Sequence, residues 1–91
     1  MNVRAHTIVS GIVQGVYFRQ NTKNQARRHG VKGWVKNLDD GRVEAVFEGD
    51  ESAVKALVEF CHIGPKGAVV TAVCVDWEPF RAEFETFDII Y

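Results

Sequence analysis

The sequence has few of the residues that build metal or redox sites. It contains two cysteines, Cys61 and Cys74, which do not form a Cys-x-x-Cys pattern. Its three histidines, His6, His29 and His62, are far apart in the chain. We therefore expect no metal ion and no cofactor. For a chain in the cytosol we also expect both cysteines to remain reduced.

Two further absences concern membranes and nucleic acids. No apolar run is long enough to span a membrane, and residues 1–6 lack the apolar core of a secretory signal peptide. The net charge is -1, so no overall electric field draws the chain to nucleic acid or to a membrane surface. We expect a cytoplasmic monomer that has neither kind of partner.

What is present is the composition of an ordinary globular domain. With 46% hydrophobic and 25% charged residues, the chain can build a modest apolar core. A length of 91 residues leaves room for one domain, which we expect to cover residues 1–91.

The order of the predicted elements indicates the fold. β-Branched and alternating residues predict strands over residues 3–13, 31–38, 42–48, 70–77 and 84–91. Apolar residues at helical spacing predict helices over residues 19–29 and from residues 49–52 to residues 64–67. The order β-α-β-β-α-β with a further C-terminal strand predicts an α+β protein, the ferredoxin-like split βαβ sandwich. We expect two helices on one face of an antiparallel sheet.

The segment that joins the first strand to the first helix reads Gly-Ile-Val-Gln-Gly-Val-Tyr-Phe-Arg over residues 11–19. A strand that turns through Gly15 into a helix leaves backbone N–H groups without partners, and converging N–H groups bind anions. The guanidinium of Arg19 follows at once and matches phosphate geometry. Alone, this segment indicates either a phosphate-binding loop closed by Arg19 or an ordinary turn with a solvated arginine.

A second segment, residues 33–43, predicts a strand, an Asp-Gly hairpin turn and the next strand. Together the two segments resemble the acylphosphatase family, and the resemblance covers essentially the whole chain. The first family signature, Gly-x-Val-Gln-Gly-Val-x-Phe-Arg, has every fixed position filled in residues 11–19. The second signature is matched by Gly33, Trp34, Val35, Lys36, Asn37, Gly41, Val43 and Gly49.

The resemblance implies an enzyme that hydrolyses the carboxyl-phosphate bond of a small-molecule acyl phosphate to a carboxylate and inorganic phosphate. It implies that Arg19 binds the phosphate and that Asn37 orients the attacking water. Inorganic phosphate or sulfate is then expected to compete with the substrate. No metal is implied, because the arginine and the backbone supply the positive charge. The predicted phosphate-binding loop consists of Gln14, Gly15, Val16, Tyr17, Phe18 and Arg19.

Two other functions compete with this one. An RNA-recognition module has the same element order, and residues 32–35, Lys-Gly-Trp-Val, echo the opening of its aromatic motif. The remaining aromatic residues do not follow at the required spacing. A non-catalytic anion-sensing domain would keep the loop without the chemistry. Taken alone, Asn37 is explained by a preference for the approach to a turn.

Overall fold

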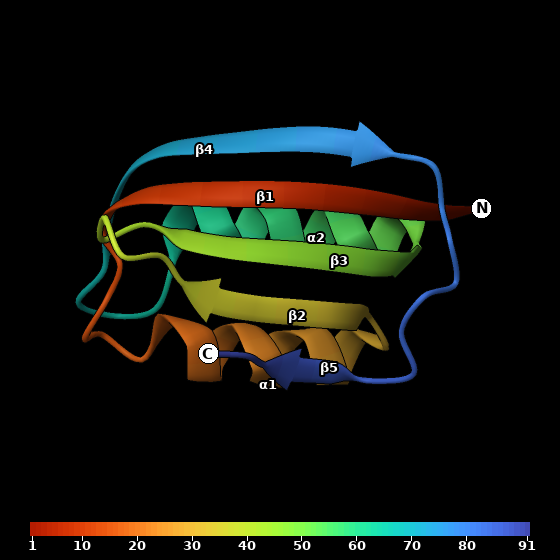
Figure 1. Ribbon diagram of the computed structural model, residues 1–91, viewed down its shortest axis with the longest axis horizontal. Helices are drawn as coiled ribbons and strands as arrows, with labels where there is room; N and C mark the ends of the chain where they lie inside the picture. Colours follow the sequence, from red (N-terminus) through yellow and green to blue (C-terminus); the bar gives the residue numbers. More distant parts are fainter.

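The computed structural model describes residues 1–91 as one five-stranded sheet with two helices packed on one of its faces (Figure 1). The strands lie in the order β4-β1-β3-β2-β5, so β3 is the central strand and β1 and β2 flank it. The strands are β1 (Asn2–Ile12), β2 (Lys32–Asn37), β3 (Val43–Asp50), β4 (Val69–Glu78) and β5 (Phe87–Ile89). The helices are α1 (Phe18–His29) and α2 (Glu51–Ile63). The predicted split βαβ architecture is confirmed.

Helix α1 buries one narrow face against the sheet. Phe18, Thr22 and Ala26 are its buried residues, at the i, i+4, i+8 spacing that the sequence predicts. The Thr22 hydroxyl donates to the Phe18 carbonyl at 2.7 Å, so this buried polar group has a partner. Gly30 ends the helix in the left-handed conformation, and its N–H donates to the Arg27 carbonyl.

Helix α2 begins at a side-chain cap. The carboxylate of Asp50 accepts from the backbone N–H of Ser52 at 3.2 Å. The buried residues of helix α2 are Val54, Leu57, Val58 and Cys61. Burial raises the pKa of the Cys61 thiol to about 12, so Cys61 is an unreactive core residue. Cys61 and Cys74 are both free thiols, and Cys74 is exposed on β4.

The sheet is mixed, which corrects the expectation of a wholly antiparallel sheet. β5 pairs in parallel with β2, with Gly33 opposite Phe87 and Val35 opposite Ile89. The reason is visible in Figure 1, where the chain leaves β4 at one edge, crosses the end of the sheet and enters β5 at the other edge. β5 therefore runs in the same direction as β2. The Phe87 ring stacks on Phe47 of the central strand β3, with ring centroids 5.7 Å apart.

β5 is also shorter than the predicted strand over residues 84–91. The buried carboxylate of Glu48 accepts the backbone N–H groups of Arg81 at 2.8 Å and Glu83 at 3.0 Å. These bonds hold residues 79–86 as a crossover loop, so the ladder with β2 begins only at Phe87. Just beyond the strand, the N–H of Ile90 still donates to the Val35 carbonyl.

Arg4 on β1 joins the same buried cluster. Its guanidinium pairs with Glu48, with Glu78 at 3.0 Å and with Glu83 at 2.9 Å. Burial opposes ionisation of Glu48, but the hydrogen bonds from the crossover loop and from Arg4 outweigh it and lower the pKa of this carboxyl. The cluster fixes the crossover loop to β1 and β3, and thereby the position at which β5 begins.

Neither helix has the length and apolar character that a membrane crossing requires.

Candidate active site

The loop between β1 and α1 has two residues in the left-handed conformation. Gly15 has φ +77° and Tyr17 has φ +60°. A Cβ at Gly15 would meet no atom within 4 Å, so the backbone conformation rather than space requires glycine there. Tyr17 makes no side-chain cap, and the first turn of α1 has no acidic residue. The first N–H groups of α1 thus have no side-chain partner at the end of the helix that favours an anion.

The side chain of Gln14 joins this loop to the β2–β3 hairpin by two hydrogen bonds. Its Nε2 donates to the Leu38 carbonyl at 2.8 Å and to the Arg42 carbonyl at 3.0 Å. Leu38 directly follows Asn37, so these bonds set the distance between the loop and Asn37. Gln14, which the sequence places in the predicted phosphate-binding loop, uses its side-chain amide to bind the hairpin and also lines the cavity.

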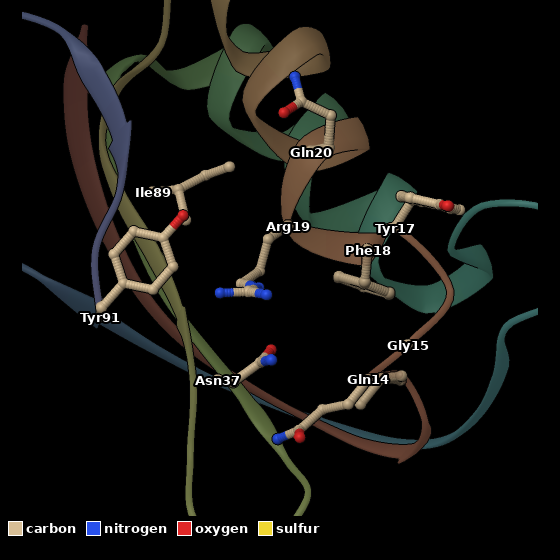
Figure 2. A pocket seen from close by; sticks show the side chains of 10 residues that line it. Gln14, Gly15, Tyr17, Phe18, Arg19, Gln20, Asn37, Ile89 and Tyr91 are labelled. Atoms are coloured by element: carbon tan, nitrogen blue, oxygen red, sulfur yellow. The ribbon is translucent and has the colours of Figure 1, made fainter.

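Asn37 is the last residue of β2, and its side chain points toward the guanidinium of Arg19 (Figure 2). The Oδ1 atom is buried and accepts no hydrogen bond from the protein. A buried acceptor without a partner costs about 1–3 kcal/mol, so such an atom is rare unless a ligand or water pairs with it. Asn37 thus lines the cavity with an amide oxygen that has no hydrogen-bond partner within the protein.

Arg19 lies in the first turn of α1. Its guanidinium forms no ion pair with a carboxylate. Its carbon lies 5.4 Å from the centroid of the Tyr91 ring. Because the charge is not neutralised inside the protein, it is available to an anionic ligand.

These groups surround one cavity of about 200 Å³. Most of the predicted loop residues and Asn37 line it; Val16 instead packs against the core. The lining residues are Val13, Gln14, Gly15, Tyr17, Phe18, Arg19, Gln20, Asn37, Ile89 and Tyr91. The sequence did not indicate Ile89 or Tyr91, which reach the cavity because β5 pairs with β2. Alternation of Phe87, Ile89 and Tyr91 was the available signal, but it does not identify the neighbouring strand.

The chemistry available in the cavity is narrow. Its lining includes one cation, Arg19, and no Asp, Glu or His. The arrangement can hold an anion with several oxygens, and the Asn37 amide can donate to and accept from a neighbouring water. No three His, Cys, Asp or Glu side chains are grouped in a way that could hold a metal ion.

Comparison with known proteins assigns this arrangement to a family. Residues 5–89 match the family described as acylphosphatase. The chain belongs to the acylphosphatase family. Members of this family hydrolyse the carboxyl-phosphate bond of acyl phosphates, and this chain is a hydrolase of that kind. The RNA-recognition alternative is set aside by the same match.

Several acylphosphatases resemble the chain over nearly their full length. The acylphosphatase of Roseiflexus sp. (strain RS-1) is 56% identical over 88 residues, which cover 97% of this chain and 95% of the relative. The acylphosphatase of Geobacter sulfurreducens is 52% identical over 91 residues and covers 100% of both chains. The crystal structure of acylphosphatase from Bacillus subtilis superposes with a TM-score of 0.94 at 38% identity, covering 98% of this chain and 99% of that one.

Proposed function

We propose that the cavity between loop 14–19 and the end of β2 is the catalytic site, and that Arg19 and Asn37 have separate roles in it. Arg19 and the loop N–H groups bind the phosphoryl oxygens of a small acyl phosphate. Asn37 orients the water that attacks phosphorus. The observation that carries the proposal is the buried, unpaired Oδ1 of Asn37 beside an arginine that has no carboxylate partner.

The reaction needs positioning more than acid–base chemistry. The water oxygen forms a bond to phosphorus while the bond between phosphorus and the acyl oxygen breaks. The electron pair of the breaking bond leaves with the carboxylate. A carboxylate is a good leaving group, so no general acid is required. A proton of the attacking water passes to a phosphoryl oxygen, which gives a carboxylate and inorganic phosphate. Holding water and phosphorus in line removes much of the entropic barrier.

Charge stabilisation is the second contribution. Negative charge spreads over the equatorial oxygens of the phosphoryl group in the transition state. Arg19 and the N–H groups at the start of α1 surround these oxygens from one side. The Gln14 bonds to the hairpin and the left-handed turn at Gly15 hold the loop N–H groups before substrate binds, and the Arg19 guanidinium lies over the Tyr91 ring. Preorganised donors of this kind lower the barrier without reorganisation.

The same site explains the remaining properties that we propose. Inorganic phosphate or sulfate competes with the substrate, because a tetrahedral anion fits a cluster of N–H groups and one guanidinium. All side chains of the site come from one chain, so a monomer is sufficient.

We also propose that the enzyme is cytoplasmic and has no nucleic-acid or membrane partner.

Substitution of Asn37 tests the proposal. Asn37→Ala should bind inorganic phosphate almost normally while kcat for benzoyl phosphate collapses, because the water contact is used mainly in the transition state. Asn37→Asp keeps the shape, removes the donor and adds charge beside an anion. If Asn37→Asp retains more than about a tenth of the parent kcat, a loss under ~1.4 kcal/mol, the water-orienting role is wrong. Arg19→Ala is the matched variant, and it should lose phosphate binding as well as turnover.

A further inference from the structure

We propose that the basic side of helix α1, and Lys23 above all, attracts the anionic substrate toward Arg19 through its charge and thereby raises kcat/KM at low ionic strength. This inference rests on the proposed function, because it takes the cavity at Arg19 as the place where the phosphoryl group binds.

The charges of the protein are unevenly distributed along the chain. All 12 Asp and Glu residues lie within residues 39–91, whereas residues 1–38 hold seven of the 11 Lys and Arg residues and no acidic residue. Helix α1 belongs to the basic part. Its four cationic side chains are those of Arg19, Lys23, Arg27 and Arg28. The helix therefore carries no carboxylate of its own to balance their charge.

Lys23 lies on the side of α1 that faces β5. Residues four positions apart share one side of a helix, so Arg19, Lys23 and Arg27 form a line along α1. At one end of this line the Arg19 guanidinium lies over the Tyr91 ring, and at the other end Arg27 donates to the Phe87 carbonyl at 3.4 Å. Lys23 is between them, about 6 Å along the helix axis from Arg19. It is therefore near the side of the cavity to which β5 and the C-terminal residue contribute.

The charge of Lys23 is not neutralised within the protein. Lys23 forms no ion pair with a carboxylate, and neither does Arg28. Arg27 lies 3.8 Å from Asp88, but both side chains are more than half exposed, so water and salt weaken this pair. No Asp or Glu lines the cavity itself. An anion that approaches along α1 therefore meets an excess of positive charge.

An acyl phosphate responds strongly to such an excess, because a phosphoryl group carries about 1.5 to 2 negative charges at neutral pH. At an ionic strength of about 10 mM the Debye length is about 30 Å, so a lysine several ångströms from the bound anion attracts it without contact. At about 1 M the Debye length is about 3 Å and the attraction is screened. The attraction raises the concentration of substrate at the cavity. It should therefore change KM and leave kcat unchanged.

The test compares Lys23→Glu with the parent at ionic strengths of about 10 mM and about 1 M. At the low value we expect kcat/KM for benzoyl phosphate to fall about fivefold, with kcat unchanged. The inhibition constant of inorganic phosphate should rise by a similar factor. At the high value the variant and the parent should agree. Arg28→Glu should lower kcat/KM only about twofold at low ionic strength, because Arg28 is farther along the helix from Arg19.

Lys55→Glu is the matched control, since it makes the same change in net charge on the other helix. Lys55 lies in the second turn of α2. That helix begins beside the N-terminus, where the N–H of Glu51 donates to the Met1 carbonyl, at the end of the sheet opposite the β1–α1 loop (Figure 1). We expect this variant to lower kcat/KM less than about twofold at either ionic strength.

Four results would overturn the inference. They are an unchanged kcat/KM in Lys23→Glu at low ionic strength, a loss in this variant that persists at about 1 M, a fall in its kcat, and an equal loss in Lys55→Glu. A thermal unfolding curve for each variant shows that the compared proteins are folded. If the Asn37 variants retain turnover, the proposed function fails first, and this outcome is distinct because it appears at every ionic strength.

Discussion

The ring of Tyr91 covers the guanidinium of Arg19, with 5.4 Å between the guanidinium carbon and the ring centroid. No carboxylate pairs with Arg19, and the Tyr91 ring is the aromatic group over which its guanidinium lies. A planar guanidinium stacks well on an aromatic face and keeps its N–H edges free for oxygen atoms. The C-terminal segment therefore lies beside the cation that we assign to phosphate binding.

The first prediction concerns this contact. Tyr91→Leu should raise the inhibition constant of inorganic phosphate about two- to fivefold, because an exposed cation–π contact contributes about 0.5–1 kcal/mol. Competition assays against benzoyl phosphate measure this constant. Tyr91→Phe keeps the ring and should behave like the parent. An unchanged constant in Tyr91→Leu would mean that Arg19 is held in place without the ring.

The second prediction concerns Gly15. Gly15→Ala should lower activity far more than stability. The left-handed conformation at φ +77° costs alanine about 1–2 kcal/mol, a modest loss for the fold. The same strain turns the loop N–H groups away from their common target. We expect weaker phosphate inhibition and a large fall in kcat/KM, with a small shift in the urea midpoint. Normal phosphate inhibition in a folded Gly15→Ala protein would argue against an anion-binding loop.

The third prediction is the response to acid. The pKa of Glu48 is lowered in the folded protein, so its ionised form stabilises the fold. That stabilisation is complete above the unfolded pKa of about 4.3, and it is lost as pH falls through the lower, folded pKa. Urea unfolding between pH 3 and pH 7 should show this decline below about pH 4.

Glu48→Gln provides the control for the acid response. Removing one partner from a buried ion pair typically costs about 3–5 kcal/mol, so the variant should be less stable at pH 7. Its stability should also depend less on pH in the acidic range, because the titrating group is gone. Equal acid sensitivity in the variant and the parent would assign the effect to the two other carboxylates that pair with Arg4, those of Glu78 and Glu83, instead of to Glu48.

The fourth prediction concerns metal ions. Hydrolysis of benzoyl phosphate should proceed at the same rate with and without a chelator such as EDTA, because Arg19 and the backbone supply the positive charge that the phosphoryl group needs. A tenfold loss with chelator that a divalent ion restores would contradict this account. Chelator must be added to the assay itself, so that trace metal from the buffer does not obscure the result.

The two signature segments predicted much of the site. Gly15, Arg19 and Asn37 lie in segments whose element types could be read locally, and the structure brings all three to one cavity. Short-range patterns such as helix faces and the Asp-Gly turn depend on residues a few positions apart. For that reason the helices and the β2–β3 hairpin agree with the sequence prediction.

The parts that were missed depend on distant partners. Alternation places Glu48 on the sheet face away from the helices, where a solvated carboxylate is expected, yet Glu48 is 1% exposed. The crossover loop buries Glu48, and no local sequence pattern predicts the path of that loop. Gln14 likewise binds the Leu38 and Arg42 carbonyls, which are more than twenty positions away. Tyr91 reaches Arg19 only because β5 is parallel to β2.

The strand order has a consequence for how the protein folds. Only β2 and β3 are neighbours joined by a tight hairpin; every other pairing in β4-β1-β3-β2-β5 joins strands that are separated by at least one whole element. Closing such long loops costs conformational entropy before the contacts that stabilise the fold can form. Refolding should therefore take milliseconds to seconds. β5 can find its edge only after β2 is in place. The wall that Ile89 and Tyr91 give to the cavity should therefore form last, and enzymatic activity should return more slowly than helical structure.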